Sequence, residues 1–236
     1  MKRYLVLFFS IFAMTTLLGQ NSPAPNKLDS NGKKHGQWSG FFDNSKVIKY
    51  EGTFNHGVET GVFTFYNDNP AHTVMATRDF SKQPNAAYTI FYDDLKNKVS
   101  EGNVVNRVYE GLWKYYHRNS KEIMTTENYK KGVLNGKRTV FYKDGKVAEE
   151  VNYVDGKKNG LYKKISGNGI VLEEAKYLAG ELQGAAVYKD PDGNVVAKGN
   201  YKKDQKWGTW QFFENGKLVS KEKYPLNGQK GKPKDK

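Results

Sequence analysis

One spacing recurs along most of this chain and limits what it can fold into. Eight small residues, seven glycines and one alanine, stand 24 to 26 positions apart: Gly36, Gly61, Ala87, Gly111, Gly136, Gly160, Gly184 and Gly208. A fixed period of this length indicates one small supersecondary unit repeated in tandem. Aromatic residues and turns recur with this period, whereas no catalytic residue type does. The chain therefore reads as a repeat protein and not as an enzyme.

Each repeat reads as one β-hairpin. Gly111 and its counterparts precede about five residues rich in aromatic and β-branched side chains, and then a polar turn. Four turns contain residues that tolerate positive φ: Asp144-Gly145, Asn168-Gly169, Asp192-Gly193 and Asn215-Gly216. A second strand ends near an aromatic residue, at Phe54, Phe80, Tyr129, Tyr153, Tyr177, Tyr201 or Tyr224. Turns such as Lys131-Gly132 and Asp155-Gly156 lead into the next unit. Eight hairpins predict about sixteen strands of about five to seven residues.

Residues 67–108 depart from this rhythm. They contain Pro70 and Pro84, have Ala87 in the place of the glycine, and lack the closing aromatic residue after Tyr92. Because proline cannot donate to a β-ladder, it marks loops, edges or bulges. We expect a distorted third unit that keeps Tyr88, Ile90 and Tyr92 on one side of a strand. The irregularity is either a site of special function or the drift of a spare repeat.

The repeat resembles the MORN (membrane occupation and recognition nexus) repeat, in its divergent bacterial form. The resemblance rests on the Gly-x-aromatic-x-aromatic-aromatic start, the Asp/Asn-Gly-Lys turn, and the Tyr-x-x-Gly close of Tyr129–Gly132 and Tyr153–Gly156. Such repeats are found in exported proteins and in proteins labelled YwqK-like antitoxins. The resemblance implies an array of hairpins over residues 34–228. It says little about function, because the repeat is a scaffold for many partners.

The N-terminus predicts export. Lys2 and Arg3 precede an apolar run that ends at Leu18, followed by a small residue and a polar break, which is typical of a signal peptide over residues 1–19. The run is shorter than the ~18 to 20 apolar residues that a membrane-anchoring helix needs. Residues 20–33 read as a flexible linker and 229–236 as a basic disordered tail. The chain has no cysteine, which excludes thiolate chemistry and a lipid anchor on cysteine. We expect the mature chain to be peripheral to a membrane at most.

The charge favours anionic partners. The formal net charge is +13, so acidic proteins, glycans or anionic lipid headgroups are candidate partners. Export argues against nucleic acid. The alternative is that the lysines keep an open sheet soluble and protect its strands from edge pairing.

The aromatic residues form a stripe along one face. In a strand, Trp113 and Tyr115 point to one side and Tyr116 to the other. We expect the stripe to form the core of a single curved sheet; its alternative role is an exposed row of rings that binds a partner. The candidate partner-binding residues are Trp38, Trp113, Tyr115, Trp210 and Phe212.

Catalytic, cofactor and metal sites are not predicted. The four histidines are scattered near turns, and the sequence contains no nucleophile elbow and no phosphate-binding loop. Glu149 and Glu150, like Glu173 and Glu174, are adjacent in a strand. Adjacent residues point to opposite faces, so these pairs are poor candidates for cooperating carboxylates.

Together these features predict an all-β protein: an extended, twisted single antiparallel sheet of about eight tandem hairpins. We expect a non-enzymatic exported scaffold that binds a protein partner in the bacterial cell envelope, within an outer-membrane, secretion, motility or surface assembly. The alternatives are a module that binds glycan or anionic lipid, and an antitoxin or immunity protein, although a cytosolic toxin target conflicts with the signal peptide.

Overall fold

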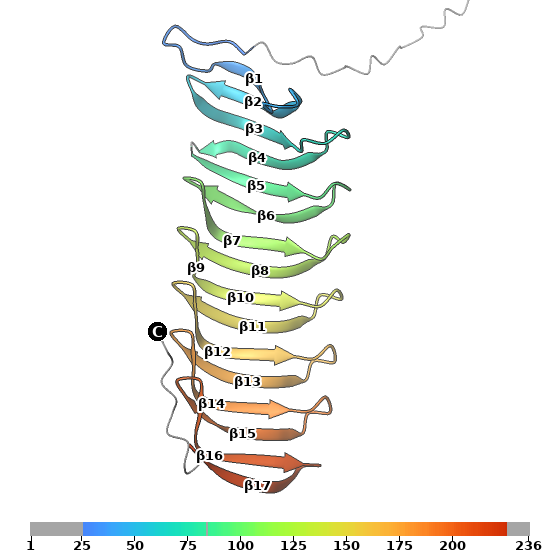
Figure 1. The fold of residues 1–236 in the computed structure, drawn as a ribbon, viewed down its shortest axis with the longest axis vertical. Helices are drawn as coiled ribbons and strands as arrows, with labels where there is room; N and C mark the ends of the chain where they lie inside the picture. Colours follow the sequence, from blue (N-terminus) through green and yellow to red (C-terminus); the bar gives the residue numbers. More distant parts are fainter. Residues whose placement is uncertain (1–25, 84, 226–236) are drawn as a thin grey trace, which may run out of the picture.

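The described part of the chain is one open antiparallel sheet. The computed structural model describes residues 26–83 and 85–225. These residues form 17 strands and no helix, and successive strands pair in chain order to give an extended ladder (Figure 1). The predicted all-β, single-sheet fold is confirmed. No helix in these two ranges is long and apolar enough to cross a membrane.

The strands have the following bounds: β1 Gly36–Phe41, β2 Ile48–Asn55, β3 Val58–Tyr66, β4 Val74–Gln83, β5 Ala86–Tyr92, β6 Lys98–Val105, β7 Val108–Tyr116, β8 Ile123–Lys130, β9 Val133–Leu134, β10 Gly136–Phe141, β11 Val147–Val154, β12 Lys157–Ile165, β13 Val171–Leu178, β14 Glu181–Lys189, β15 Val195–Lys202, β16 Gln205–Glu214 and β17 Lys217–Tyr224.

The strands β9 and β10 are two pieces of one strand. Both pair with β8, and only Asn135 separates them. Counted in this way, the sheet has the eight hairpins that the spacing predicts. The expected strand length of five to seven residues is wrong, because most strands have eight to ten residues, such as β7 with 9. The prediction placed each strand start at the repeat glycine, whereas β7 begins three residues before Gly111.

Five of the repeat glycines, Gly61, Gly111, Gly160, Gly184 and Gly208, lie inside strands, at bulges. Glu101 pairs with Lys114 and Asn103 with Glu110, so residues 111–113 of β7 all lie opposite Gly102. Gly111 has a φ of 69°, a conformation that costs a residue with a Cβ atom ~1 to 2 kcal/mol. A Cβ atom at Gly111 would meet nothing within 4 Å. At Gly111 the requirement for glycine is therefore conformational and does not come from packing.

The hairpins use two kinds of turn. Two-residue turns such as Asp155-Gly156, with φ of 47° and 78°, line one long edge of the sheet (Figure 1). Positive φ at both positions suits the right-handed twist of the strands. Most connections on the other edge are longer. There Tyr142 N donates to Lys146 O at 2.8 Å, and only Gly145 needs positive φ. Asp144 does not adopt the positive φ that its position in an Asp-Gly pair suggests.

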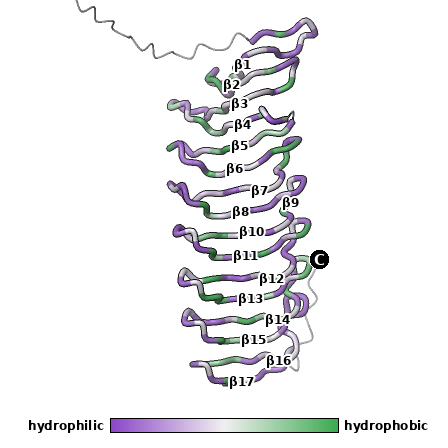
Figure 2. Tube along the Cα trace, turned by 180° about the vertical axis from the view of Figure 1, so that it is seen from behind, coloured by the Kyte–Doolittle hydropathy of each residue, from purple (hydrophilic) through white to green (hydrophobic). Residues whose placement is uncertain are grey.

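The described strands form a single layer, and the core consists of side chains that pack against one another on one face of the sheet. We call the face that carries Phe63, Trp113 and Trp210 the inner face. Across it runs a line of register partners, the central row, in which several large residues lie beside a glycine, as in the pairs Trp38 with Gly52 and Trp210 with Gly199. Polar and apolar residues are interspersed along the strands (Figure 2). A ring that lies over a glycine becomes buried without a covering sheet or helix.

The N-terminal edge is covered by residues 26–34. The side chain of Asn26 donates to Ser39 O at 2.9 Å and accepts from Ser39 N at 2.8 Å. Lys27 O accepts a hydrogen bond from Trp38 Nε1 at 3.0 Å. Residues 26–33 are the described part of the predicted 20–33 linker. The predicted signal peptide 1–19, the tail 229–236 and Pro84 lie outside the described residues.

Candidate binding site

The third unit is the hairpin of β5 and β6. Where β5 pairs with the preceding strand, β4, the backbone register differs from that of the other units. Asp79 pairs with Tyr88 and Gln83 with Ala86. Residues 80–82 of β4 therefore lie opposite Ala87, so the bulge has moved to the partner strand. The physical reason is the Cβ atom of Ala87, because an alanine in the left-handed conformation is strained, and Ala87 is not among the residues with positive φ. The predicted distortion of this unit is confirmed.

The third unit also lacks three large side chains of the inner face. Thr89 occupies the central-row position of Trp113, Val104 the position of the closing aromatic residue, and Asn85 the position of Tyr109. In the fourth unit the rings of Tyr109 and Trp113 stack with centroids 3.6 Å apart. The third unit has a hollow of about 580 Å³ at this place, which is within the size range of ligand sites.

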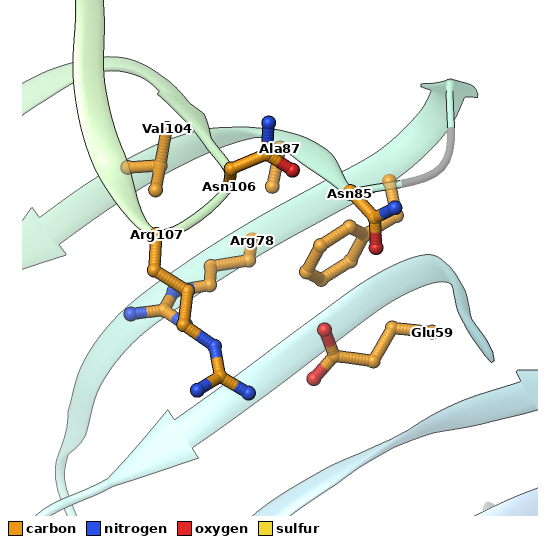
Figure 3. Close-up of a pocket in the computed structure, with 8 residues that line it drawn as sticks. Glu59, Arg78, Asn85, Ala87, Val104, Asn106 and Arg107 are labelled. Atoms are coloured by element: carbon orange, nitrogen blue, oxygen red, sulfur yellow. The ribbon is translucent and has the colours of Figure 1, made fainter. Parts of the chain in front are cut away.

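Charged and polar side chains line this hollow, hereafter the third-unit hollow. Arg78 comes from β4, Arg107 and Asn106 from the turn after β6, Asn85 from the turn before β5, and Glu59 from β3 (Figure 3). Phe80, Ala87 and Val104 supply its apolar part.

The polar groups of the hollow have unused hydrogen-bonding capacity. Arg78 Nε, in the lining of the hollow, is a buried atom with no hydrogen-bond partner in the described chain; Thr89 Oγ1 is another, on the register partner of Arg78 but outside the lining. The guanidinium of Arg78 lies 4.9 Å from the ring centroid of Phe65, and no ion pair involves Arg78 or Arg107 among the described residues. Buried polar atoms in native proteins nearly always have partners. These exceptions mark the hollow as a place for an external group.

A second hollow of about 430 Å³ continues from the first. The two share Glu59, Asn85 and Arg107 in their linings, and the second also contacts Lys34 and Phe65. Lys34 is already engaged, because its Nζ lies 4.6 Å from the ring centroid of Trp38. Lys34 Nζ also donates to the hydroxyl of Tyr50 at 2.8 Å, so within the described residues the two arginines are the cations of the combined depression that hold no hydrogen-bond acceptor.

The two best-buried aromatic candidates from the sequence form the core. Trp113 is 0 % exposed and Trp210 1 % exposed, and their Nε1 atoms donate to Asn103 O and Asn200 O. Tyr115, Phe212 and Trp38 are half-buried on the same face. The hydroxyl of Tyr115 lies 3.2 Å from that of Tyr129, and burial raises the pKa of Tyr115 above its usual range. Only these last three present part of a ring to the surface.

Sequence reasoning missed a role for three lysines. Lys34, Lys158 and Lys206 each lie two residues before a repeat glycine, and each places its Nζ over a ring of the central row. For Lys206 the distance to the Trp210 centroid is 4.6 Å. Such contacts are worth ~0.5 to 1 kcal/mol at exposed sites. The common spacing from the glycine is the signal that could have shown them.

The repeated glutamates form an ion-pair network on the inner face. Glu149 and Glu150 do point to opposite faces, but Glu149 and Glu173 share one, each in register with Lys164. Arg138 donates to Glu149 at 2.7 Å and to Glu127 at 3.0 Å. Burial raises the pKa of Glu173. No group of three or more His, Asp or Glu side chains within residues 26–83 and 85–225 is arranged to hold a metal ion.

Two segments match a known family. Residues 134–155 and 182–203 each match the family described as MORN repeat variant. Each segment covers one hairpin, β10 with β11 and β14 with β15, and begins two residues before the repeat glycine. The chain carries MORN repeats. The other hairpins belong to the same sheet and, apart from the third unit, keep a similar register, so the hairpin architecture of the two matched segments continues along the described sheet. A search of curated proteins finds no match to this sequence.

Proposed function

We propose that this MORN-repeat protein is an exported, non-enzymatic scaffold that binds a partner protein in the bacterial cell envelope. The observation that carries the proposal is the third-unit hollow, where Arg78 and Arg107 have no ion-pair partner in the described chain. MORN repeats belong to a scaffold family.

The fold suits recognition by a large partner. Each hairpin contacts its sequence neighbours, so the array presents a long, pre-formed inner face. A pre-formed surface loses little conformational entropy on binding. In the second hollow, the half-buried ring of Phe65 offers apolar contact area, and aromatic residues are favoured anchors of interfaces.

The test is capture of a partner from an envelope extract by the mature chain, followed by a measured affinity for the purified partner. A variant with residues 67–85 replaced by a segment of a regular repeat removes Arg78, Phe80 and Asn85 from the hollow, and Trp113→Ala probes the core. We expect the first variant to lose capture. Trp113→Ala should keep it if the variant remains folded. Equal capture by wild type and the replaced variant would place recognition elsewhere on the chain.

Export is tested by N-terminal sequencing of the protein from the envelope fraction. We expect the mature chain to begin near Gln20 or Asn21, because the polar break follows Gly19. Full-length chain in the cytoplasm would contradict export and favour the antitoxin alternative.

Glycan binding is the second candidate function, and the half-buried rings of Trp38, Tyr115 and Phe212 favour it. To separate the alternatives, we would measure binding of the chain to a panel of glycans and to vesicles with anionic headgroups. These results are then compared with the capture of a partner protein. Saturable binding of a glycan that Tyr115→Ala and Phe212→Ala abolish would favour this candidate. Binding to anionic vesicles alone would favour the lipid alternative.

A further inference from the structure

We propose that the third-unit hollow binds a carboxylate, supplied by a glutamate or aspartate side chain of the partner protein. This inference rests on the proposed function, because it names the chemistry of the partner at the same site.

The first step is the origin of the space. In the regular units a large residue of the central row lies over a small one, as Trp113 does over Gly102. In the third unit the corresponding pair is Arg78 with Thr89. Threonine is too small to fill the space that a tryptophan occupies in the fourth unit. The register partner of Thr89 in β6 is Gly102, which has no side chain. The hollow opens beside the pair of Arg78 and Thr89: Arg78 lines it, together with Ala87 and Val104, which stand where a regular unit has its glycine and its closing aromatic residue.

The second step is the charge. A guanidinium presents a planar set of donors that fits a carboxylate with two parallel hydrogen bonds. Arg78 reaches the hollow from β4 and Arg107 from the turn after β6 (Figure 3). Elsewhere on the inner face, Arg138 already holds Glu127 and Glu149. That triad shows what an arginine of this face does when carboxylates are available.

The third step is the choice of carboxylate over other anions. Glu59 also lines the hollow, and an ionised carboxylate can only accept hydrogen bonds. Glu59 would repel a dianionic phosphate but would accept a hydrogen bond from a peptide N–H. Phe80, Ala87 and Val104 give the hollow an apolar wall, which suits the methylene groups of a glutamate better than a ring of hydroxyls.

The experiment is a titration of the full mature chain, followed by NMR of the arginine Nε–H groups and of the amide signals of residues 106 and 107. The probes are acetyl-Ala-Glu-Ala-amide, its glutamine counterpart, inorganic phosphate and glucuronate. We expect saturable shifts with the glutamate peptide, at least tenfold weaker binding of the glutamine peptide, and weaker binding of phosphate and glucuronate than of the glutamate peptide.

Two variants test the arginines. Arg107→Gln lies in an exposed turn and should weaken binding of the glutamate peptide about tenfold or more without unfolding the chain. Arg78→Gln should do the same, and its amide spectrum shows whether the packing on Phe65 survives. The matched control is Lys131→Gln, which removes one positive charge from the next turn along the same edge.

Equal binding of the glutamate and glutamine peptides, tighter binding of phosphate or glucuronate, or no effect of Arg107→Gln would overturn the inference. The absence of any peptide binding would also overturn it. Capture of a partner protein that persists in Arg107→Gln would refute the carboxylate site and leave the proposed scaffold function standing. Loss of both peptide binding and partner capture in Arg107→Gln would support the inference, whereas failure of the wild-type chain to capture any partner would count against the proposed function itself.

Discussion

Replacing Gly102 by alanine adds a methyl group where the indole of Trp113 already lies. The new Cβ atom would be 2.5 Å from the nearest ring atom. The ring cannot withdraw, because Tyr109 stacks on it and its Nε1 donates to Asn103 O at 3.0 Å. Overpacking of this kind costs ~1 to 3 kcal/mol. Trp113→Ala removes a fully buried ring and costs ~3 to 5 kcal/mol.

The two changes should not add. Once the ring is gone, the methyl group at position 102 enters free space, and the pair becomes like Ala175 with Ala186, which the sixth and seventh units already use. We expect the double variant to be ~1 to 3 kcal/mol more stable than the sum of the single losses predicts. The assay is urea unfolding followed by circular dichroism, with melting temperatures as a check at ~2 to 4 °C for each kcal/mol.

The matched control is Gly111→Ala. A Cβ atom there meets open space, and the cost of ~1 to 2 kcal/mol comes from a φ of 69°. This change should add to Trp113→Ala within ~0.5 kcal/mol. If Gly102→Ala melts like wild type, or couples to Trp113→Ala no more strongly than Gly111→Ala does, the packing of large residues beside glycines does not hold the sheet together.

Three further predictions follow from particular residues. Gly160→Val should lower the stability by ~1 to 3 kcal/mol through backbone strain alone, because φ is 94° and the space is open; an unchanged melting temperature would contradict this. The hydrogen bond from His56 lowers the pKa of Asp29 to about 2, so the support that Asp29 gives to the N-terminal turn is complete above the ordinary value of 3.8 and lost as the pH falls toward 2. Hydrogen exchange of the Asn31 and Lys33 amides measures it, and Asp29→Asn should remove the pH dependence. Arg78→Gly combined with Thr89→Trp rebuilds the regular pair, and should raise the melting temperature while abolishing peptide binding; retained binding would show that the ligand sits outside the hollow.

The period of the sequence was enough to predict the architecture, because each hairpin carries its own turn and strand signals. The place of the distortion was also predictable from Ala87 and the missing aromatic residue at Val104. The form of the distortion was not predictable. The bulge lies in β4 and not in β5, and this depends on which of the two paired strands holds the two extra residues. The hollow depends on which side chains are absent from a face. Its lining joins residues from Glu59 to Arg107, which come together only through strand register.

The bulge of the third unit, which lies in β4 instead of β5, also divides the sheet into two parts. Ten strand positions follow β6, and at ~4.8 Å for each strand they form an arm of about 48 Å. The third unit is the only one among the described hairpins whose extra residues lie in the preceding strand. A turn of about 10° at this joint would carry the far end of the arm through about 8 Å. A ligand bound in the proposed site would lie at the base of this arm, where a small rearrangement would displace the far end by more than one strand spacing.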